Sequence, residues 1–491
     1  MNKRSKIYVD SILEPIYRFT KREYFVYILQ INIAHISMLA KQQILQHEEA
    51  TKMVEVNRSL QREGFDKEYD PQFEDLFFML EDQMTQMVGE ELVGNMHIAF
   101  SRNDMDATMF RMHFRKKLAE WLEEITQLQT RLLQMSTEHK DTIMTAYTHN
   151  QQAQPTTLAH YLLGLANHLQ RDLDRGYALL ERMNECPMGA AALGTTGFPI
   201  DREYMAEMLG FDKAMDNSYD AIAAADYMLE IGSTLSIYLS TLSRFVYDFI
   251  FLATNEVSGI RLDDSLVQTS SIMPQKRNPS SLEHTRSAIS HTLGRLQGTY
   301  YMTHSVPFGD IVDIGDDIQP VLQEGIDETV SITKLLSEIL SNTSFNKQEL
   351  LKKCENGFST VTELADTLVR QHGFSFRMAH KIVQSYVGDL INKGSDLKEG
   401  NFQEFKKVVS DTSGVEITMS EADYLQAIDP RNFIQVRAIK GGPNPNETER
   451  QVASLQVRLE RMTEKVRKFH TKLQTYENRL DVAELIKSET N

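Results

Sequence analysis

The sequence predicts an all-α protein built around long helices, and three observations support this fold class. The 491 residues include only 12 prolines and 24 glycines, the residues that most often interrupt helices. Apolar side chains recur at spacings of three and four, the period of a helix with one buried face. Residues 104–149 contain neither proline nor glycine, and a second such run, 212–231, resumes after Gly232. Helices of that length are typical of bundles.

The chain divides into three expected parts. Residues 1–105 form a domain of shorter helices, and residues 106–357 form a central bundle of long helices with a polar loop at 268–280. Residues 358–491 form a C-terminal helical domain that contains the turn-rich segment 440–445. No strand-like alternation dominates, although short hairpins in the glycine-rich connections stay open.

The last helix carries a heptad pattern. Apolar residues recur at alternating spacings of four and three, which is typical of a coiled-coil seam. These residues are Leu455, Leu459, Met462, Val466, Phe469, Leu473, Tyr476 and Leu480. The pattern fits a helix on its own bundle and a helix paired with another chain equally well.

Composition excludes some classes of function. The net charge is −17, from 69 acidic and 52 basic side chains. Because phosphate backbones attract basic surfaces, this balance argues against nucleic-acid binding. Binding of a small anionic substrate is still compatible with the negative net charge, since a few cations at the binding site can outweigh the charge of the whole protein.

The sequence also indicates a cytoplasmic protein. Cys186 and Cys354 are too few for a disulfide framework and lack metal-site spacing, so we expect buried thiols in a reducing compartment. The N-terminus continues into acidic residues rather than an apolar segment, which argues against a signal peptide. The apolar stretch 221–254 carries four charged side chains, which argues against a membrane span.

The polar loop brings together groups suited to catalysis. Ser270 and Ser271 supply hydroxyls, while Lys276 and Asn278 offer a charge and N–H donors to a carboxylate. A hydroxyl beside a cation becomes more acidic, which would make it a base. The two prolines in this stretch resist helix, and Asn278 looks like the cap of a helix with Glu283 near its first turn. On composition alone, an ordinary serine-rich surface loop is the main alternative.

Two further polar segments have both structural and functional interpretations. Ser101–Asp104 offers a hydroxyl, a guanidinium and an amide that suit a carboxylate, although helix capping by Ser101 explains the same residues. The segment 147–155 includes Thr148, His149 and Gln152 and is expected at the end of a long helix. A single histidine there is usually structural.

The polar segments together resemble a known family. Residues 270–279, Ser-Ser-Ile-Met-Pro-Gln-Lys-Arg-Asn-Pro, resemble the signature loop of the fumarase/aspartase superfamily, and Pro-Gln-Lys is similar to the argininosuccinate lyase version. Ser-Arg-Asn-Asp at 101–104 and Thr-His followed by Gln-x-Ala-Gln-Pro resemble two other motifs of that family. The resemblance extends over most of the chain, through segments 189–202, 217–221, 365–380 and 429–442.

The resemblance implies a fold and an activity. The fold would have three helical domains, with a central bundle that forms the core of a homotetramer. The activity would be a carbon–nitrogen lyase reaction, the reversible anti-elimination of an amine from an N-substituted aspartate to release fumarate. Each active site would combine segments of three subunits, and neither a metal nor a cofactor would be needed.

The resemblance also implies residue roles. Ser270 would remove the carbon-bound proton, Lys276 would stabilise the carboxylate, and His149, oriented by Glu283, would serve the acid side. The substrate-binding residues would be Ser101, Arg102, Asn103, Thr148, Gln152, Ser271, Met273 and Asn278.

Several positions depart from the family pattern. Thr269 stands where the family usually has glycine before the two serines, and Phe100 and Ala225 stand where arginine is common. In the segment 310–318, Asp310, Gly315 and Ile318 replace Tyr, Gln and Lys. By this resemblance, the residues expected to bind the fumarate half of the substrate are unchanged, while residues expected to bind the rest of the substrate are altered.

The departures predict a substrate other than argininosuccinate, such as an aminopolycarboxylate like ethylenediamine-disuccinate or a biosynthetic intermediate. The alternatives are a true argininosuccinate lyase of arginine biosynthesis, a non-catalytic structural relative like the lens crystallins, and a helical scaffold that uses the heptad helix.

Overall fold

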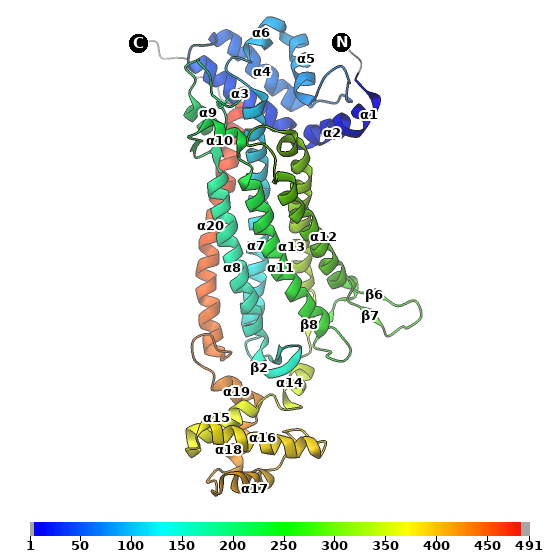
Figure 1. Ribbon diagram of the computed structural model, residues 1–491, viewed down its shortest axis with the longest axis vertical. Helices are drawn as coiled ribbons and strands as arrows, with labels where there is room; N and C mark the ends of the chain where they lie inside the picture. Colours follow the sequence, from blue (N-terminus) through cyan, green and yellow to red (C-terminus); the bar gives the residue numbers. More distant parts are fainter. Residues whose placement is uncertain (1–3, 483–491) are drawn as a thin grey trace.

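The computed structural model describes residues 4–482 and shows an elongated, mainly helical molecule (Figure 1). A cap of N-terminal helices lies at one end, long helices run through the middle, and a cluster of short helices lies at the other end. The predicted all-α class is confirmed, with two-stranded ribbons in some of the connections.

The N-terminal cap packs around one apolar helix. Its elements are α1 (Lys6–Tyr8), the π-helical turn η1 (Val9–Leu13), α2 (Glu14–Glu23), α3 (Phe25–Lys41), α4 (His47–Glu63), α5 (Leu76–Val88) and α6 (Glu90–Asn95). α3 is buried over most of its length, which explains why its apolar residues do not follow a single face. Asp75 caps α5 by accepting the Phe78 N–H at 3.2 Å, and this places its carboxylate next to the start of the bundle.

The central bundle consists of long helices that run along the molecular axis. They are α7 (Arg102–Glu138), α8 (Leu158–Met183), α11 (Asp226–Leu252), α12 (Ser280–Thr303), α13 (Ile318–Ser341) and α20 (Pro445–Val482). α7 has 37 residues, so it spans about 55 Å at ~1.5 Å per residue. Residues at its two ends therefore cannot contact the same small molecule.

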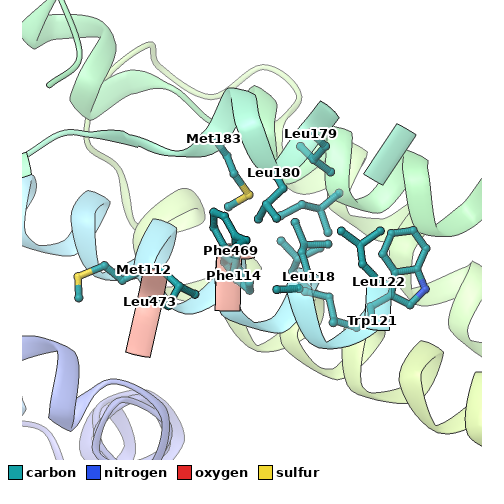
Figure 2. Packing of buried hydrophobic residues seen from close by; sticks show 14 of the residues in the cluster. Met112, Phe114, Leu118, Trp121, Leu122, Leu179, Leu180, Met183, Phe469 and Leu473 are labelled. Atoms are coloured by element: carbon teal, nitrogen blue, oxygen red, sulfur yellow. The ribbon is translucent and has the colours of Figure 1, made fainter. Parts of the chain in front are cut away.

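The bundle core is closely packed where α7, α8 and α20 meet. Figure 2 shows Trp121 and Leu122 of α7 facing α8, with Phe469 of α20 against the same cluster. Gly176 allows this approach, because a Cβ there would lie 2.6 Å from a Trp121 ring carbon and 2.8 Å from Leu122. The small residue thus sets the distance between the two helices.

The heptad pattern of α20 is explained within the chain. Seven of its eight heptad residues are buried in the main core, Tyr476 is partly buried, and the helix packs along α7 and α8. Of the two alternatives, packing on its own bundle is the one that the structure shows. α20 therefore adds to the bundle rather than to the small domain with which the sequence grouped it, while the boundaries near 105 and 357 stay predictions.

The apolar helix α11 packs inside the same bundle. By length and mean hydropathy, 1.3 over its most apolar window, it could cross a membrane, a property that it shares with core helices of soluble proteins. Here it packs against α8, α12 and α13. Gly232 does not interrupt it, and a Cβ at this position would lie 3.1 Å from Thr299 Oγ1 of α12.

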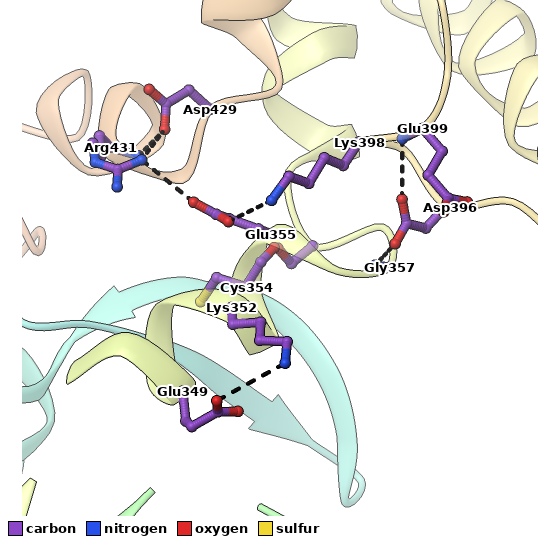
Figure 3. A network of polar contacts seen from close by, with 11 residues as sticks. Glu349, Lys352, Cys354, Glu355, Gly357, Asp396, Lys398, Glu399, Asp429 and Arg431 are labelled. Carbon is purple, nitrogen blue, oxygen red and sulfur yellow. Dashed lines mark hydrogen bonds and ion pairs between the residues drawn. The ribbon is translucent and has the colours of Figure 1, made fainter. Parts of the chain in front are cut away.

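The small C-terminal domain has its own apolar core. Its helices are α15 (Val361–His372), α16 (Phe376–Asn392), α17 (Phe402–Ser413), α18 (Glu421–Ala427) and α19 (Pro430–Gln435). Helix α14 (Lys347–Glu355) joins it to the bundle. At this junction, Glu355 accepts hydrogen bonds from Lys398 at 2.7 Å and from Arg431 at 3.5 Å (Figure 3).

Short ribbons form the connections between helices. They pair β1 (Ile143–Thr148) with β2 (Gln151–Thr157), β3 (Glu185–Cys186) with β4 (Lys213–Ala214), β5 (Ile260–Leu262) with β8 (Thr343–Phe345), and β6 (Gln268–Thr269) with β7 (Arg277–Asn278). The remaining elements are α9 (Arg202–Met208), α10 (Ser218–Ala223), the 3-10 turn η2 (Asp264–Leu266) and the π-helical turn η3 (Asp313–Asp317).

Two expectations about helix ends were wrong. α7 ends at Glu138, and residues 143–157 form a hairpin instead of continuing the helix, because β-branched and aromatic residues favour a strand there. Asn278 does not cap α12: it pairs with Gln268 in a ribbon, and the helix begins at Ser280 without a side-chain cap. Glu283 does lie in the first turn of α12, as expected.

Candidate active site

The signature loop, residues 270–276, lies at the tip of the β6–β7 ribbon and extends away from the bundle (Figure 1). Arg277 anchors its base by pairing with Asp264 and by donating to the Leu262 carbonyl oxygen at 2.8 Å. The side chains of Ser271, Met273 and Lys276 are exposed. The loop thus presents its polar groups outward on a fixed base.

Ser270 is set in the loop by its own neighbours. Its Oγ accepts the N–H groups of Ile272 at 3.3 Å and Met273 at 3.1 Å. Its N–H donates to the Lys276 carbonyl oxygen at 3.4 Å. Two N–H donors aimed at one oxygen favour its anionic form, because hydrogen bonds to a charged group stabilise the charge.

His149 lies at the tip of the β1–β2 hairpin, not at a helix end. Thr148 and Gln151 close the hairpin, and His149 and Asn150 between them have φ values of 52° and 57°. Two consecutive residues with positive φ form the type I′ turn that suits a two-residue hairpin. Thr148 and His149 are exposed there and free to face another molecule.

Gln152 connects this hairpin to the small domain. Its amide donates to the Lys353 carbonyl oxygen at 3.2 Å, near the end of α14. Two residues further, Gln154 donates to Thr362 Oγ1 of α15 at 3.2 Å. The hairpin that carries His149 is therefore attached to the junction shown in Figure 3.

The segment Ser101–Asp104 begins α7 with a capping box. Ser101 Oγ accepts the Asn103 N–H at 3.3 Å, and Asp104 accepts the Ser101 N–H at 3.1 Å. The other Asp104 oxygen accepts the N–H groups of Gly189 and Ala191 at 2.8 and 2.9 Å, which fixes the start of the segment 189–202. Burial raises the pKa of Asp104 to about 6, although these N–H groups oppose the shift.

Arg102 and Asn103 project from the same turn. The Arg102 guanidinium pairs with Asp75 and lies 5.1 Å from the centre of the Phe78 ring. Asn103 donates to the Ala192 carbonyl oxygen at 3.3 Å. Within this one motif, Ser101 and Asp104 cap the helix, while Arg102 and Asn103 direct their polar side chains away from it.

A cavity of about 690 Å³ lies beside Arg102, between α2, α5, α7 and η3. Gly315 lines it, whereas Ile318 is fully buried in the main core. Of these two altered positions, Gly315 therefore lies in the cavity wall and Ile318 lies away from it. Asp106 and Asp316 also line the cavity and were not identified from the sequence.

The predicted site residues do not come together in one chain. Ser101–Asn103 lie at the start of α7, while the hairpin with His149 follows its far end, about 55 Å away at ~1.5 Å per helical residue. The signature loop lies toward that far end as well, on its own ribbon (Figure 1). Among residues 4–482, no hydrogen bond or ion pair joins Ser270 to His149 or to Arg102. Nor is any group of three or more acidic, histidine or cysteine side chains in this range placed to hold a metal ion.

Comparison with known proteins identifies the class. A family model described as lyase matches residues 14–294, and one described as the argininosuccinate lyase C-terminal domain matches residues 358–435. Argininosuccinate lyase 1 of Shouchella clausii is 34% identical over 468 residues, which cover 95% of this chain and 94% of the relative. The argininosuccinate lyase of Methanococcus maripaludis strain C7 is 31% identical over 96% of this chain and 95% of its own.

Solved structures agree with this comparison. An EDDS lyase in complex with formate has a TM-score of 0.86 at 28% identity and covers 98% of this chain and 95% of its own. A class II fumarase from Schistosoma mansoni shares the fold alone, with a TM-score of 0.67 at 16% identity over 87% of this chain and 92% of its own. The bundle and its polar segments thus define a fumarate-releasing carbon–nitrogen lyase of the fumarase/aspartase superfamily. Within that superfamily, the chain belongs to the argininosuccinate lyase family, as the sequence motifs indicated.

Proposed function

We propose that the protein catalyses the reversible anti-elimination of an amine from an N-substituted aspartate other than argininosuccinate. The observation that carries this proposal is the contrast between two sets of residues. Ser270, Lys276, Asn278, His149 and Glu283 keep the family pattern. The segment 310–318, in contrast, is altered at three positions, and part of it lines the cavity beside Arg102.

Ser270 removes the proton from the carbon next to the substrate carboxylate. The electrons of the broken C–H bond first add charge to that carboxylate, and they then form the double bond of fumarate as the C–N bond breaks. Lys276 and Asn278 stabilise the added charge, and such electrostatic stabilisation is usually the largest contribution to catalysis. The backbone N–H groups of Ile272 and Met273 support the anionic Ser270 oxygen.

His149 supplies the proton that the leaving nitrogen needs. Its location at an exposed hairpin tip suits a group that reaches into a neighbouring subunit. Glu283, exposed in the first turn of α12, orients the imidazole of the histidine that it meets. Arg102, Asn103 and Thr148 bind the half of the substrate that becomes fumarate, with Ser101, Gln152, Ser271 and Met273 around them.

We propose that the active unit is a cytoplasmic homotetramer with composite sites. The separation of Arg102 from His149 along α7 supports this, because one chain cannot bring both to one substrate. Light scattering of the pure protein should give the mass of four chains. A monomer that associates only with a foreign protein would instead favour the scaffold alternative.

The activity is tested by following the ultraviolet absorbance of fumarate with argininosuccinate and with other N-substituted aspartates. Ser270→Ala should lower kcat by roughly 10²–10⁴-fold, the usual contribution of a general base. Ser265→Ala, a nearby exposed serine outside the loop, serves as the matched control and should retain activity. Full activity of Ser270→Ala, or no fumarate from any substrate, would contradict the proposal, and argininosuccinate as the best substrate would favour the arginine-biosynthesis alternative.

A further inference from the structure

The cavity beside Arg102 has a strongly acidic wall. The carboxylates that line it are Asp10, Glu14, Asp75, Asp106, Asp316, Asp317 and Glu324. The cations that line it are Arg18, Arg22 and Arg102. Acidic groups thus outnumber basic groups in a space of about 690 Å³, which is large enough for a small ligand.

The cations of this wall already have partners. Arg18 pairs with Glu14, Arg22 with Glu23, and Arg102 with Asp75. The side chains of Asp106 and Asp316, by contrast, make no hydrogen bond or ion pair with any residue between 4 and 482. Asp317 is likewise unpaired in that range but exposed, so Asp106 and Asp316 are the two less exposed carboxylates of the cavity without a directly paired cation.

The electrostatics of these two carboxylates agree with this lack of charge partners. Burial raises the pKa of Asp106 well above its ordinary value, and the charges of Asp75, Asp316 and Asp310 add to the effect while Arg102 opposes it. Burial also raises the pKa of Asp316 to about 6, with Asp317 as the next cause. A ligand cation placed between them would favour their charged forms.

Two nearly fully buried side chains of the wall each have one polar atom without a partner in the described part of the chain, although Gln319 Nε2 donates to the Ile314 carbonyl oxygen at 2.7 Å. Tyr24 is 2% exposed and Gln319 is 1% exposed, and both line the cavity. The Tyr24 hydroxyl and Gln319 Oε1 have no hydrogen-bond partner among the residues that the structure describes. Because buried polar atoms are nearly always hydrogen-bonded, these atoms indicate a polar ligand at this wall. An ammonium group has N–H donors for Gln319 Oε1 and for the carboxylates.

One of the three altered positions lies in the same wall. Gly315 lines the cavity, while Ile318 is buried in the core. Asp310 does not line the cavity, but its negative charge acts on Asp106 and Asp316. Both π-helical turns of the described chain, η1 and η3, contribute to this wall, and such turns are frequent at functional sites.

We propose that this cavity holds the leaving-amine half of the substrate and selects an amine with a second, positively charged nitrogen and no carboxylate. This inference rests on the proposed lyase function. The second ammonium lies between Asp106 and Asp316, while Arg102 and Asn103 hold the half that becomes fumarate. A carboxylate on the amine would face those two aspartates and be repelled.

Three substrates of similar length test the charge preference. N-(3-aminopropyl)aspartate carries the second cation, N-butylaspartate is neutral there, and N-(2-carboxyethyl)aspartate is anionic. Fumarate release should give a kcat/KM for the aminopropyl compound at least about tenfold above that for the butyl compound, as expected for a charge-assisted hydrogen bond. The carboxyethyl compound should be the poorest of the three.

Variants connect this preference to the two aspartates. Asp106→Asn and Asp316→Asn should each lower the ratio of aminopropyl to butyl kcat/KM by about tenfold, through KM rather than kcat. Asp313→Asn, in the same π-helical turn but outside the cavity wall, should leave the ratio unchanged. Thermal melts show whether each variant folds, and if Asp106→Asn does not fold, Asp316→Asn alone decides.

The outcomes separate this inference from the lyase reaction itself. Equal or better turnover of the butyl or carboxyethyl compound overturns the charge preference and leaves the lyase function intact. A ratio unchanged in Asp316→Asn overturns the assignment of the wall. No fumarate from these compounds or from argininosuccinate overturns the proposed function, and this inference with it.

Discussion

Restoration of activity by mixing two inactive variants tests the composite site most directly. Arg102 begins α7 and His149 follows its far end, so the two side chains of one chain are about 55 Å apart by helix geometry. If both act on one substrate, they come from different subunits. Arg102→Gln keeps a polar side chain at this turn, and His149→Asn keeps a residue that tolerates the positive φ of the hairpin turn.

The expected recovery follows from the number of intact sites. When the two variants mix at equal amounts, a site has an intact Arg102 in half of the cases and an intact His149 in half of the cases. The mixed tetramers should therefore show about a quarter of the wild-type activity, while each variant alone is nearly inactive. The assay is fumarate release by co-expressed or co-refolded chains.

A matched control shows whether the recovery requires an intact Arg102 from one of the two chains. Arg102→Gln mixed with the double variant Arg102→Gln/His149→Asn contains no intact Arg102, so it should stay inactive. Recovery in this control, or activity of the first mixture no higher than the mean of its two components, would refute the composite site. The reasoning from α7 would then fail as well.

The remaining predictions concern stability. Gly176→Ala should lower the free energy of unfolding by about 1–3 kcal/mol, because the new methyl group would overlap the Trp121 ring. Gly164→Ala in the same helix places its methyl group in open space, so this control should be neutral or stabilising. Chemical denaturation measures the free energy of unfolding of both variants. Burial lowers the pKa of His113 from 6.5 to about 4, so its neutral form stabilises the fold above pH 6.5, and that stability is lost as the pH falls toward 4. His113→Gln should flatten the dependence of unfolding free energy on pH between pH 6.5 and 4. The control His149→Asn, at an exposed turn, should keep the wild-type pH dependence. A pH dependence of His113→Gln that matches the wild type would contradict the role given to His113.

Much of the fold could be predicted from local sequence. Helix period and the scarcity of proline and glycine are properties of neighbouring residues, and they identified the bundle and the all-α class. The heptad pattern of the last helix could also be predicted from local sequence, but it did not show which helices pack against the apolar face. The choice of α7 and α8 depends on contacts between residues more than 250 positions apart, such as Arg458 with Asp174.

The hairpin with His149 could not be predicted from the absence of proline and glycine alone. The residues from Ile143 to Thr148 favour a strand by their shape, yet no proline or glycine separates them from α7. The partner strand decides the outcome, because Pro155 cannot continue a helix and pairs instead with Thr145. The sequence therefore selected His149 as a candidate site residue but did not predict its position on a turn.

The cavity that we propose for the amine could be found only in the tertiary structure. Asp75, Asp106 and Asp316 come from the start of α5, from α7 and from η3, and no spacing in the sequence relates them. The family pattern pointed to the segment 310–318 but treated its three altered positions alike. In the structure Gly315 lines the cavity and Ile318 is buried, so only Gly315 of these two positions faces the space that we propose for the amine.

The motif Ser101–Asp104 shows why capping and binding are not competing interpretations. Ser101 and Asp104 use their side-chain oxygens to close the first turn of α7 and to fix the loop at Gly189. The turn that they fix carries Arg102 and Asn103 between them, with their side chains beside the cavity and the loop. A residue pattern that looked like an ordinary helix start is therefore also what positions the guanidinium. Precise placement of Arg102 depends on the cap, so the structural role of Ser101 and Asp104 supports the binding role that we propose for Arg102 and Asn103.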